Sequence, residues 1–212
     1  MTKFYDISPL INSQIAVFPG DVPYTRTQSM GFPDNHLTLS SINTTLHVGA
    51  HVDAPLHYQE HGESIENRDL SYYFGRCQVI VVDLPARACI QVKDVQSVDI
   101  VAERILFKTN SFNDPCQWHN NFNGISPELI DYLATKSVKL VGLDTPSVDL
   151  SDSKDLPCHH NIYRHKMAIL EGVLLTKVPE GIYTLIALPL KLQGADASPV
   201  RAVLLDVSYC RE

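Results

Sequence analysis

The chain has 212 residues, of which 44% are hydrophobic and 19% charged, a length and composition that one compact globular domain accommodates. This composition excludes a disordered or fibrous protein. The formal net charge of −7 argues against binding to nucleic acid or anionic lipid, so we expect a small-molecule partner.

The N-terminal residues and the length of the apolar runs indicate in which cellular compartment the protein is expected. No apolar run approaches the roughly 18 residues that span a bilayer, so we expect no membrane association. Residues 1–6 are too polar for a secretory signal. We therefore expect a cytoplasmic protein formed by a single domain over residues 1–212.

The cysteines are odd in number, widely spaced and without a CxxC pair: Cys77, Cys89, Cys116, Cys158 and Cys210. This pattern predicts neither a disulfide framework nor a thiolate zinc site, so we interpret most of them as packing residues. Cys158, next to His159, raises a nucleophile hypothesis, which requires a positioned base and an electropositive pocket.

Strand signals come first in chain order. Residues 37–43 (LTLSSIN) alternate with a period near two, which predicts a strand with one wetter face that leads to His47. Apolar, β-branched runs bounded by Gly, Pro or Asp predict buried strands at residues 77–83, 105–108, 139–143 and 183–192.

Helical signals are fewer. Ser126 can cap a helix whose first position suits Pro127 and whose apolar stripe is Leu129, Ile130 and Leu133. A second helix is expected over about 159–166 and a weaker one over 92–98. The Asn-rich stretch 111–124 predicts a loop that binds or covers a site. The expected fold class is α/β with a strand-rich mixed sheet.

The main chemical signal lies in residues 46–58, LHVGAHVDAPLHY. His47, His51 and Asp53 offer two imidazoles and a carboxylate, a ligand set that suits Zn²⁺ and permits Mn²⁺. His57 is either a third imidazole ligand or a free proton-transfer group, since its unperturbed pKa of about 6.5 suits general acid–base work. His61 lies beyond the pattern and is expected to be exposed.

Spacing indicates how these residues are presented. In an extended chain, residues two apart share a face, which here groups His47, Gly49, His51, Asp53, Pro55 and His57. Pro55 argues against a helix and would stiffen the turn that carries His57. The alternative, a solvated strand edge rich in histidine, explains any one of these histidines better than it explains the whole group.

A second concentration of candidate ligands lies in residues 155–172, at His159, His160, His165 and Glu171. A helix that ends near His165 and a strand that starts near Met167 would return His159 and Glu171 to one pocket. Apolar neighbours indicate that Glu171 is buried, and a buried carboxylate needs a metal or a cation as its companion. A salt-bridged core residue is the alternative. Asp53 and Glu171 could both bridge two metals.

The motif HVGAHVDAPLHY resembles that of the cyclase-like metal hydrolases, HxGxHxDxPxH, and the chain as a whole most resembles the bacterial kynurenine formamidases (arylformamidases). The similarity covers nearly the whole chain, through YDISPLI, VFPGD, GRCQVIVVD, GLDTPSVD with the following SK, MAILEG, LIALPLKL and DASPVRAVL. The resemblance implies a swivelling β/β/α fold, a homodimer, and two zinc ions that cleave N-formyl-L-kynurenine, an aromatic formamide of tryptophan catabolism, to L-kynurenine and formate.

Residue roles also follow from the resemblance. It makes His47, His51 and Asp53 ligands of the first ion, with Asp53 also touching the second. A histidine of the segment after SK would bind the second ion, and Glu171 would bridge both. The twelve-residue interval to Glu171 selects His159 over His160 in that pattern. His57 would transfer protons.

Phe18 is the one departure from the family pattern. The family usually has Trp before PGD to pack the substrate, so Phe18 retains stacking but lacks the indole N–H. Two rival functions are a related amide or lactam hydrolase, acting on an isatin-like or cyclic imide substrate, and a non-catalytic metal-binding protein with a closed site.

Overall fold

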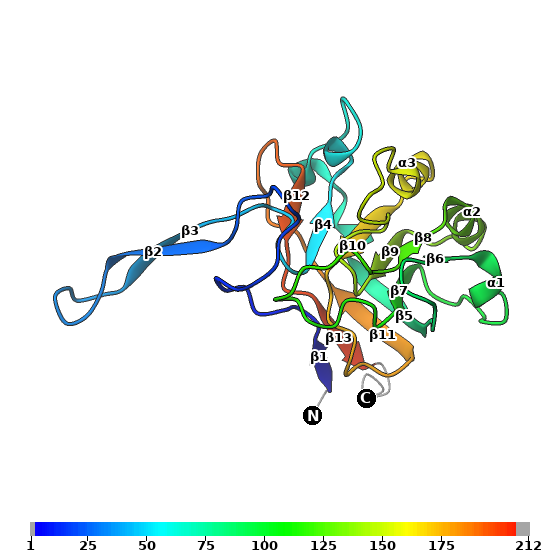
Figure 1. Ribbon diagram of the computed structural model, residues 1–212, viewed down its shortest axis with the longest axis horizontal. Coiled ribbons are helices and arrows are strands. Elements are labelled where there is room, and N and C mark those ends of the chain that lie inside the picture. The colour runs from blue at the N-terminus through cyan, green and yellow to red at the C-terminus, as the bar shows by residue number, and fades with distance from the viewer. Residues whose placement is uncertain (1–2, 207–212) are drawn as a thin grey trace.

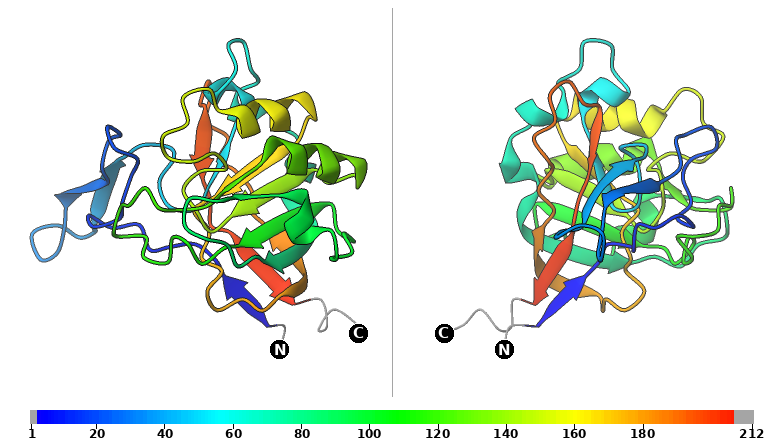
Figure 2. Two further views of the ribbon diagram at one scale, coloured as in Figure 1. Left: turned by 45° about the vertical axis from the view of Figure 1, so that its right-hand side comes forward. Right: turned by 90° about the vertical axis from the view of Figure 1, so that its left-hand side faces the viewer.

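A computed structural model describes residues 3–206, which form a mixed α/β fold around one strongly curled sheet of nine strands (Figures 1 and 2). Cys210 lies outside the described residues. The sheet strands are β1 (Phe4–Asp6), β4 (His51–Asp53), β5 (Phe74–Val81), β7 (Arg104–Lys108), β9 (Leu140–Leu143), β10 (Ala168–Glu171), β11 (Gly181–Ile186), β12 (Ala197–Pro199) and β13 (Val203–Asp206).

The strand order is β1-β13-β11-β5-β7-β9-β10-β4-β12. The four central strands β5, β7, β9 and β10 are parallel, as expected for hydrophobic runs buried on both faces. The remaining strands pair antiparallel at both sides of this centre. The strand that carries His51 therefore lies near one edge of the sheet, between β10 and β12.

Alternating side chains of the central strands enter two buried cores. Val79 and Leu106 point into a core inside the curl of the sheet, whereas Ile80 and Ile105 point into a core beneath the helices. The predicted buried strands at 77–83, 105–108 and 139–143 are confirmed, with small shifts at their ends.

Three short α-helices lie along one face of the sheet (Figure 1): α1 (Val92–Val95), α2 (Pro127–Thr135) and α3 (Pro157–Arg164). The Ser126 hydroxyl accepts a hydrogen bond from the N–H of Leu129, which confirms the predicted cap of α2. Helix α3 begins two residues before the predicted start because Pro157 suits a first helical turn. Among the described residues, no helix has the length and apolarity to cross a bilayer.

The remaining elements are short. Strands β6 (Cys89–Ile90) and β8 (Gly124–Ile125) form a small parallel pair. Three 3-10 helices, η1 (Pro55–His57), η2 (Ile65–Asn67) and η3 (Leu70–Tyr72), follow β4.

Strands β2 (Thr25–Met30) and β3 (Leu39–Asn43) form a two-stranded ribbon that projects from the body of the protein (Figure 1). All residues of both strands are exposed, so the expectation of one buried face at 37–43 is wrong. Alternation predicted the strand, but the ribbon has no sheet beneath it to bury a face.

The predicted strand at 183–192 is wrong in its second half. Strand β11 ends at Ile186, and the following Leu188 and Leu190 are exposed. Pro189, between them, has no N–H to donate to a ladder, which favours a non-strand conformation.

Candidate metal centre

Strands β4 and β10 bring the two candidate ligand segments together. Glu171 is the Cα partner of His51 in this antiparallel pair, and His51 and Asp53 are two residues apart on one strand. The three side chains therefore share one face of the sheet. The other face of β4 buries Val52 in the core inside the curl.

His47 and His57 reach the same place by a different route from the predicted one. Only residues 51–53 of the motif are extended: Gly49 has a positive φ of 62°, and Pro55 begins the 3-10 helix that ends at His57. The expectation that Pro55 opposes a helix is wrong, because proline suits the first position of a helical turn. The turns still bring the rings of His47 and His57 together, with centroids 4.1 Å apart.

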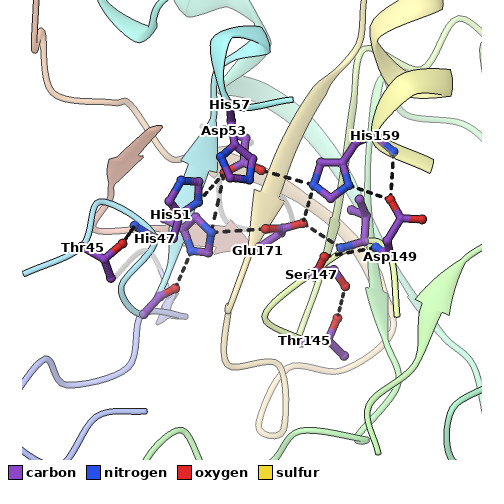
Figure 3. Close-up of polar contacts among 12 residues, drawn as sticks. Thr45, His47, His51, Asp53, His57, Thr145, Ser147, Asp149, His159 and Glu171 are labelled. Carbon is purple, nitrogen blue, oxygen red and sulfur yellow. Dashed lines mark hydrogen bonds and ion pairs between the residues drawn. The ribbon is translucent and has the colours of Figure 1, made fainter. Parts of the chain in front are cut away.

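Figure 3 shows imidazole nitrogens facing a common set of carboxylate oxygens. Nδ1 of His47 lies 3.1 Å from Oδ1 of Asp53, and Nε2 of His51 lies 3.2 Å from Oε2 of Glu171. Nε2 of His159 lies 3.5 Å from Oδ2 of Asp53 and 3.8 Å from Oε1 of Glu171. The structure thus places all five predicted metal-binding residues in one cluster, and His159 and Glu171 return to one pocket as predicted.

The second nitrogen of each of these three imidazoles is held by a neighbour outside the cluster. Nε2 of His47 lies 3.0 Å from Asp196, and Nδ1 of His159 lies 2.7 Å from Asp149. Nδ1 of His51 lies 2.9 Å from the carbonyl oxygen of Gly49. Metal-ligating histidines typically have this arrangement, in which the outer contact fixes the tautomer and the ring orientation.

Several inward-facing atoms have no hydrogen bond. Among the described residues, Nε2 of His51 and both carboxylate oxygens of Asp53 are buried without a hydrogen-bond partner. The histidine nitrogens near Asp53 lie within ion-pair distance but not in hydrogen-bond geometry. Buried polar atoms left in this way are costly, and a metal ion between them would satisfy them. These nitrogen and oxygen donors fit Zn²⁺ or Mn²⁺.

The carboxylates set the charge of the cluster in the absence of a metal. Burial disfavours the charged form of His47, but contacts with Asp196 and Asp53 outweigh it and raise the pKa of His47 to about 10. For His159, contacts with Asp149 and Asp53 likewise outweigh burial and raise the pKa to about 10. Burial opposes ionisation of Asp53, yet the neighbouring histidines hold its pKa well below its usual range.

His57 differs from these histidines. It is partly exposed, and Nδ1 lies 3.6 Å from a carboxylate oxygen of Asp196. Burial of its ring lowers its pKa. Ligand atoms of His57 also lie close enough to those of other residues to join a metal-binding group, either with His47 and Asp196 or with Asp53 and His159.

Asp196 and Asp149 belong to the site, and the sequence interpretation did not single them out. Neither lies in the histidine motif, but the segment GLDTPSVD ends at Asp149 and the segment DASPVRAVL begins at Asp196, so the family resemblance contained a signal for both. Asp196 precedes β12, whose Ala197 is the Cα partner of Asp53. Asp149 accepts hydrogen bonds from the backbone N–H groups of Cys158 and His159. The role of Asp196 follows from the pairing of distant strands, and the role of Asp149 follows from its contacts with the start of α3.

Other candidates lie away from this chemistry. Cys158 is fully buried, and burial together with nearby Asp149 raises the pKa of its thiol, the opposite of an activated nucleophile. His61 is exposed, as expected. His160 is exposed, and His165 lies 2.7 Å from Asp131 on α2.

A cavity of about 410 Å³ opens over the cluster. His47, His51, His57, His159 and Glu171 contribute to its lining. Its aromatic lining is formed by Phe18, Phe112 and Trp118, and the rings of Phe18 and Trp118 make an edge contact with centroids 4.7 Å apart. The loop predicted at 111–124 therefore lines the site. This volume suits a small aromatic ligand.

Fold and site define a strand-rich α/β protein with a histidine–carboxylate cluster that could hold metal ions at the floor of an aromatic cavity. The model of the Cyclase family matches residues 5–150, and the chain belongs to this family.

Solved structures are similar over almost the whole chain. A potential metal-dependent hydrolase with cyclase activity is 31% identical, with 97% of this chain and 98% of that chain covered and a TM-score of 0.83. A predicted metal-dependent hydrolase from Bacillus stearothermophilus is also 31% identical, with coverage of 97% and 99% and a TM-score of 0.82. An isatin hydrolase bound to the product analogue thioisatinate shares the fold at 18% identity, with coverage of 97% and 92% and a TM-score of 0.82.

Proposed function

We propose that the protein is a metal-dependent hydrolase of aromatic amides, an arylformamidase that cleaves N-formyl-L-kynurenine to L-kynurenine and formate. The observation that carries this proposal is the set of buried, unpaired ligand atoms of His51 and Asp53 at the floor of an aromatic cavity. The similarity to metal-dependent hydrolases at 31% identity supports hydrolytic chemistry.

His47, His51 and Asp53 would hold one metal ion, and His159 and Glu171 would hold a second, with Asp53 facing both groups. Glu171 would contribute to both groups, because one of its oxygens faces His51 and the other faces His159. Bound zinc or manganese would lower the pKa of a water molecule and polarise the carbonyl oxygen of the substrate.

His57 is our candidate for the proton transfer that hydrolysis requires. It lies beside the cluster and lines the cavity. A neutral imidazole can accept a proton from the attacking water and return it to the departing aniline nitrogen. Asp196, 3.6 Å from Nδ1 of His57, would stabilise the charged imidazolium between these two transfers.

Phe18 is our candidate for stacking against the aryl group. Its ring is held by the edge contact with Trp118, so the face that a substrate would meet is fixed before binding. In this proposal the aryl ring of the substrate would lie at the cavity wall, and the scissile amide would face the histidine–carboxylate cluster.

Hydrolysis by zinc-loaded protein tests this proposal in two assays run side by side: formate release from N-formyl-L-kynurenine, and ring opening of isatin to isatinate. We expect turnover of the formamide to exceed turnover of the lactam. Faster opening of isatin would favour the second candidate, a lactam hydrolase, for which the fold similarity to an isatin hydrolase is the supporting observation. Turnover of neither substrate would contradict both.

A further inference from the structure

The charges that line the cavity are all of one sign apart from the histidines. Its described lining includes the carboxylates of Asp21, Asp144, Glu171 and Asp196, and no lysine or arginine. Arginine and lysine are the usual partners of a ligand carboxylate. The protein therefore offers no side-chain cation to an anionic group on the part of a substrate that lies away from the metal centre.

Three of these four carboxylates already have partners. Glu171 faces His51 and His159, and Asp196 faces His47 and His57. Asp144 accepts hydrogen bonds from Thr109 and Asn110.

Asp21 is differently placed. Asp21 is exposed, and its N–H donates to the carbonyl oxygen of Phe18 at 2.9 Å, which places its backbone in a turn next to the aromatic wall. One carboxylate oxygen accepts the hydroxyl of Thr45 at 3.2 Å. The same hydroxyl accepts the N–H of His47 at 3.3 Å, which links this turn to the metal centre. In residues 3–206, the other oxygen of Asp21 has no hydrogen bond or ion pair.

We propose that Asp21 binds an ammonium group on the substrate, so that the cavity selects aryl formamides that carry an ammonium over those whose only charge is negative. This inference rests on the proposed hydrolysis of aryl formamides. A carboxylate attracts an ammonium by charge. The amino-acid side chain of N-formyl-L-kynurenine carries such an ammonium next to a carboxylate, whereas the aryl ring and the amide are common to many formamides.

The test compares three substrates with the same scissile bond: N-formyl-L-kynurenine, neutral formanilide and anionic N-formylanthranilate. Asp21→Asn retains an acceptor for Thr45 and removes the charge, and Asp21→Lys reverses it. The matched control is Asp34→Lys, which makes the same charge change at an exposed residue of the β2–β3 ribbon that does not line the cavity.

We expect Asp21→Asn to lower the ratio of kcat/KM for N-formyl-L-kynurenine to that for formanilide by about two- to fivefold, the effect of one partly exposed ion pair. Asp21→Lys should lower this ratio further and raise the relative kcat/KM of N-formylanthranilate. Asp34→Lys should leave both ratios unchanged.

The protein could hydrolyse formanilide while the kcat/KM ratios stay the same in Asp21→Asn and Asp21→Lys. That result would overturn this inference and leave the proposed function standing. An equal response to Asp34→Lys would assign the effect to net charge and would also overturn it. Hydrolysis of none of the three formamides by zinc-loaded protein would overturn both proposals.

Discussion

Nδ1 of His159 lies 2.7 Å from a carboxylate oxygen of Asp149, and both side chains are buried. The contact directs Nε2 of His159 toward Asp53 and Glu171. Asp149 also accepts the N–H groups of the first turn of α3, so one carboxylate fixes both the helix start and the imidazole that it carries.

Asp149→Ala should weaken metal binding without removing a ligand. Outer partners of metal-ligating histidines typically contribute about 10- to 100-fold to metal affinity. We expect a loss of this size for the ion held by His159, measured by competition with a chromophoric chelator. Asp131→Ala is the matched control, because Asp131 contacts Asn161 and Arg164 of α3 from outside the cluster. Equal losses in both variants would assign the effect to helix stability.

His57→Ala should retain the metal and lose turnover. General acid–base groups contribute about 10²- to 10⁴-fold to rate, so kcat should fall by that factor while the metal content of the purified protein stays unchanged. His61→Ala, at an exposed histidine, should change neither quantity. Unchanged turnover would exclude the proton-transfer role, and loss of metal would make His57 a ligand instead.

Gly172→Ala should destabilise the fold at the metal centre. Gly172 has a positive φ of 65°, and a Cβ there would meet the carbonyl oxygen of Gly49 at 2.2 Å, where His47 and His51 are joined. Backbone strain and overlap together should lower the free energy of unfolding by about 3 kcal/mol or more.

Gly194→Ala separates the cost of backbone strain from the cost of steric overlap. Gly194 has a similar φ of 69° and no atom within 4 Å of an added Cβ, so only the conformational cost of about 1 kcal/mol should appear. Denaturant unfolding of both variants measures the difference. Equal losses would show that the close approach of Gly172 and Gly49 contributes nothing.

Metal affinity should rise with pH. His47 and His159 have pKa values of about 10 in the metal-free protein, so both are charged near neutrality. Their charged forms stabilise the metal-free fold fully below about pH 6.5, and this contribution is lost as pH rises through about 10. A metal ion requires neutral imidazoles and must displace these protons.

Calorimetric titration with zinc measures this linkage. In two buffers of different ionisation enthalpy, the apparent binding enthalpies should differ, because protons are released on binding. Zinc affinity should increase from about pH 7 to about pH 9. Equal enthalpies and a flat affinity profile would contradict protonated histidines in the metal-free cluster.

Much of this fold could be predicted from local pattern. The buried strands at 105–108 and 139–143 and the capped helix at Ser126 follow from apolar runs and capping chemistry, which act over a few residues. The exposed β2–β3 ribbon and the early end of β11 at Ile186 depend on which surfaces other segments cover. The hydrophobic periodicity of a segment does not indicate which of its faces other segments will cover.

For the site, too, some residues could be predicted from local sequence pattern and others could not. The density of histidine and aspartate identified His47, His51 and Asp53, but the predicted uniform extended geometry fails at Gly49 and Pro55, where the chain turns. Asp149 and Asp196 were missed because their contacts with His159 and His47 depend on how the chain folds, over ten residues in the first case and between distant segments in the second. Asp196 lies 149 positions from His47, and no sequence spacing marks that contact.

We propose that the cluster of His47, His51, Asp53, His159 and Glu171 performs metal-dependent amide hydrolysis. The most direct measurement is formate release from N-formyl-L-kynurenine by purified protein, before chelation, after chelation and after zinc is restored. We predict turnover that is lost on chelation and recovered with zinc. Turnover that survives complete removal of metal would contradict the account, as would no turnover in protein shown to contain metal at this cluster.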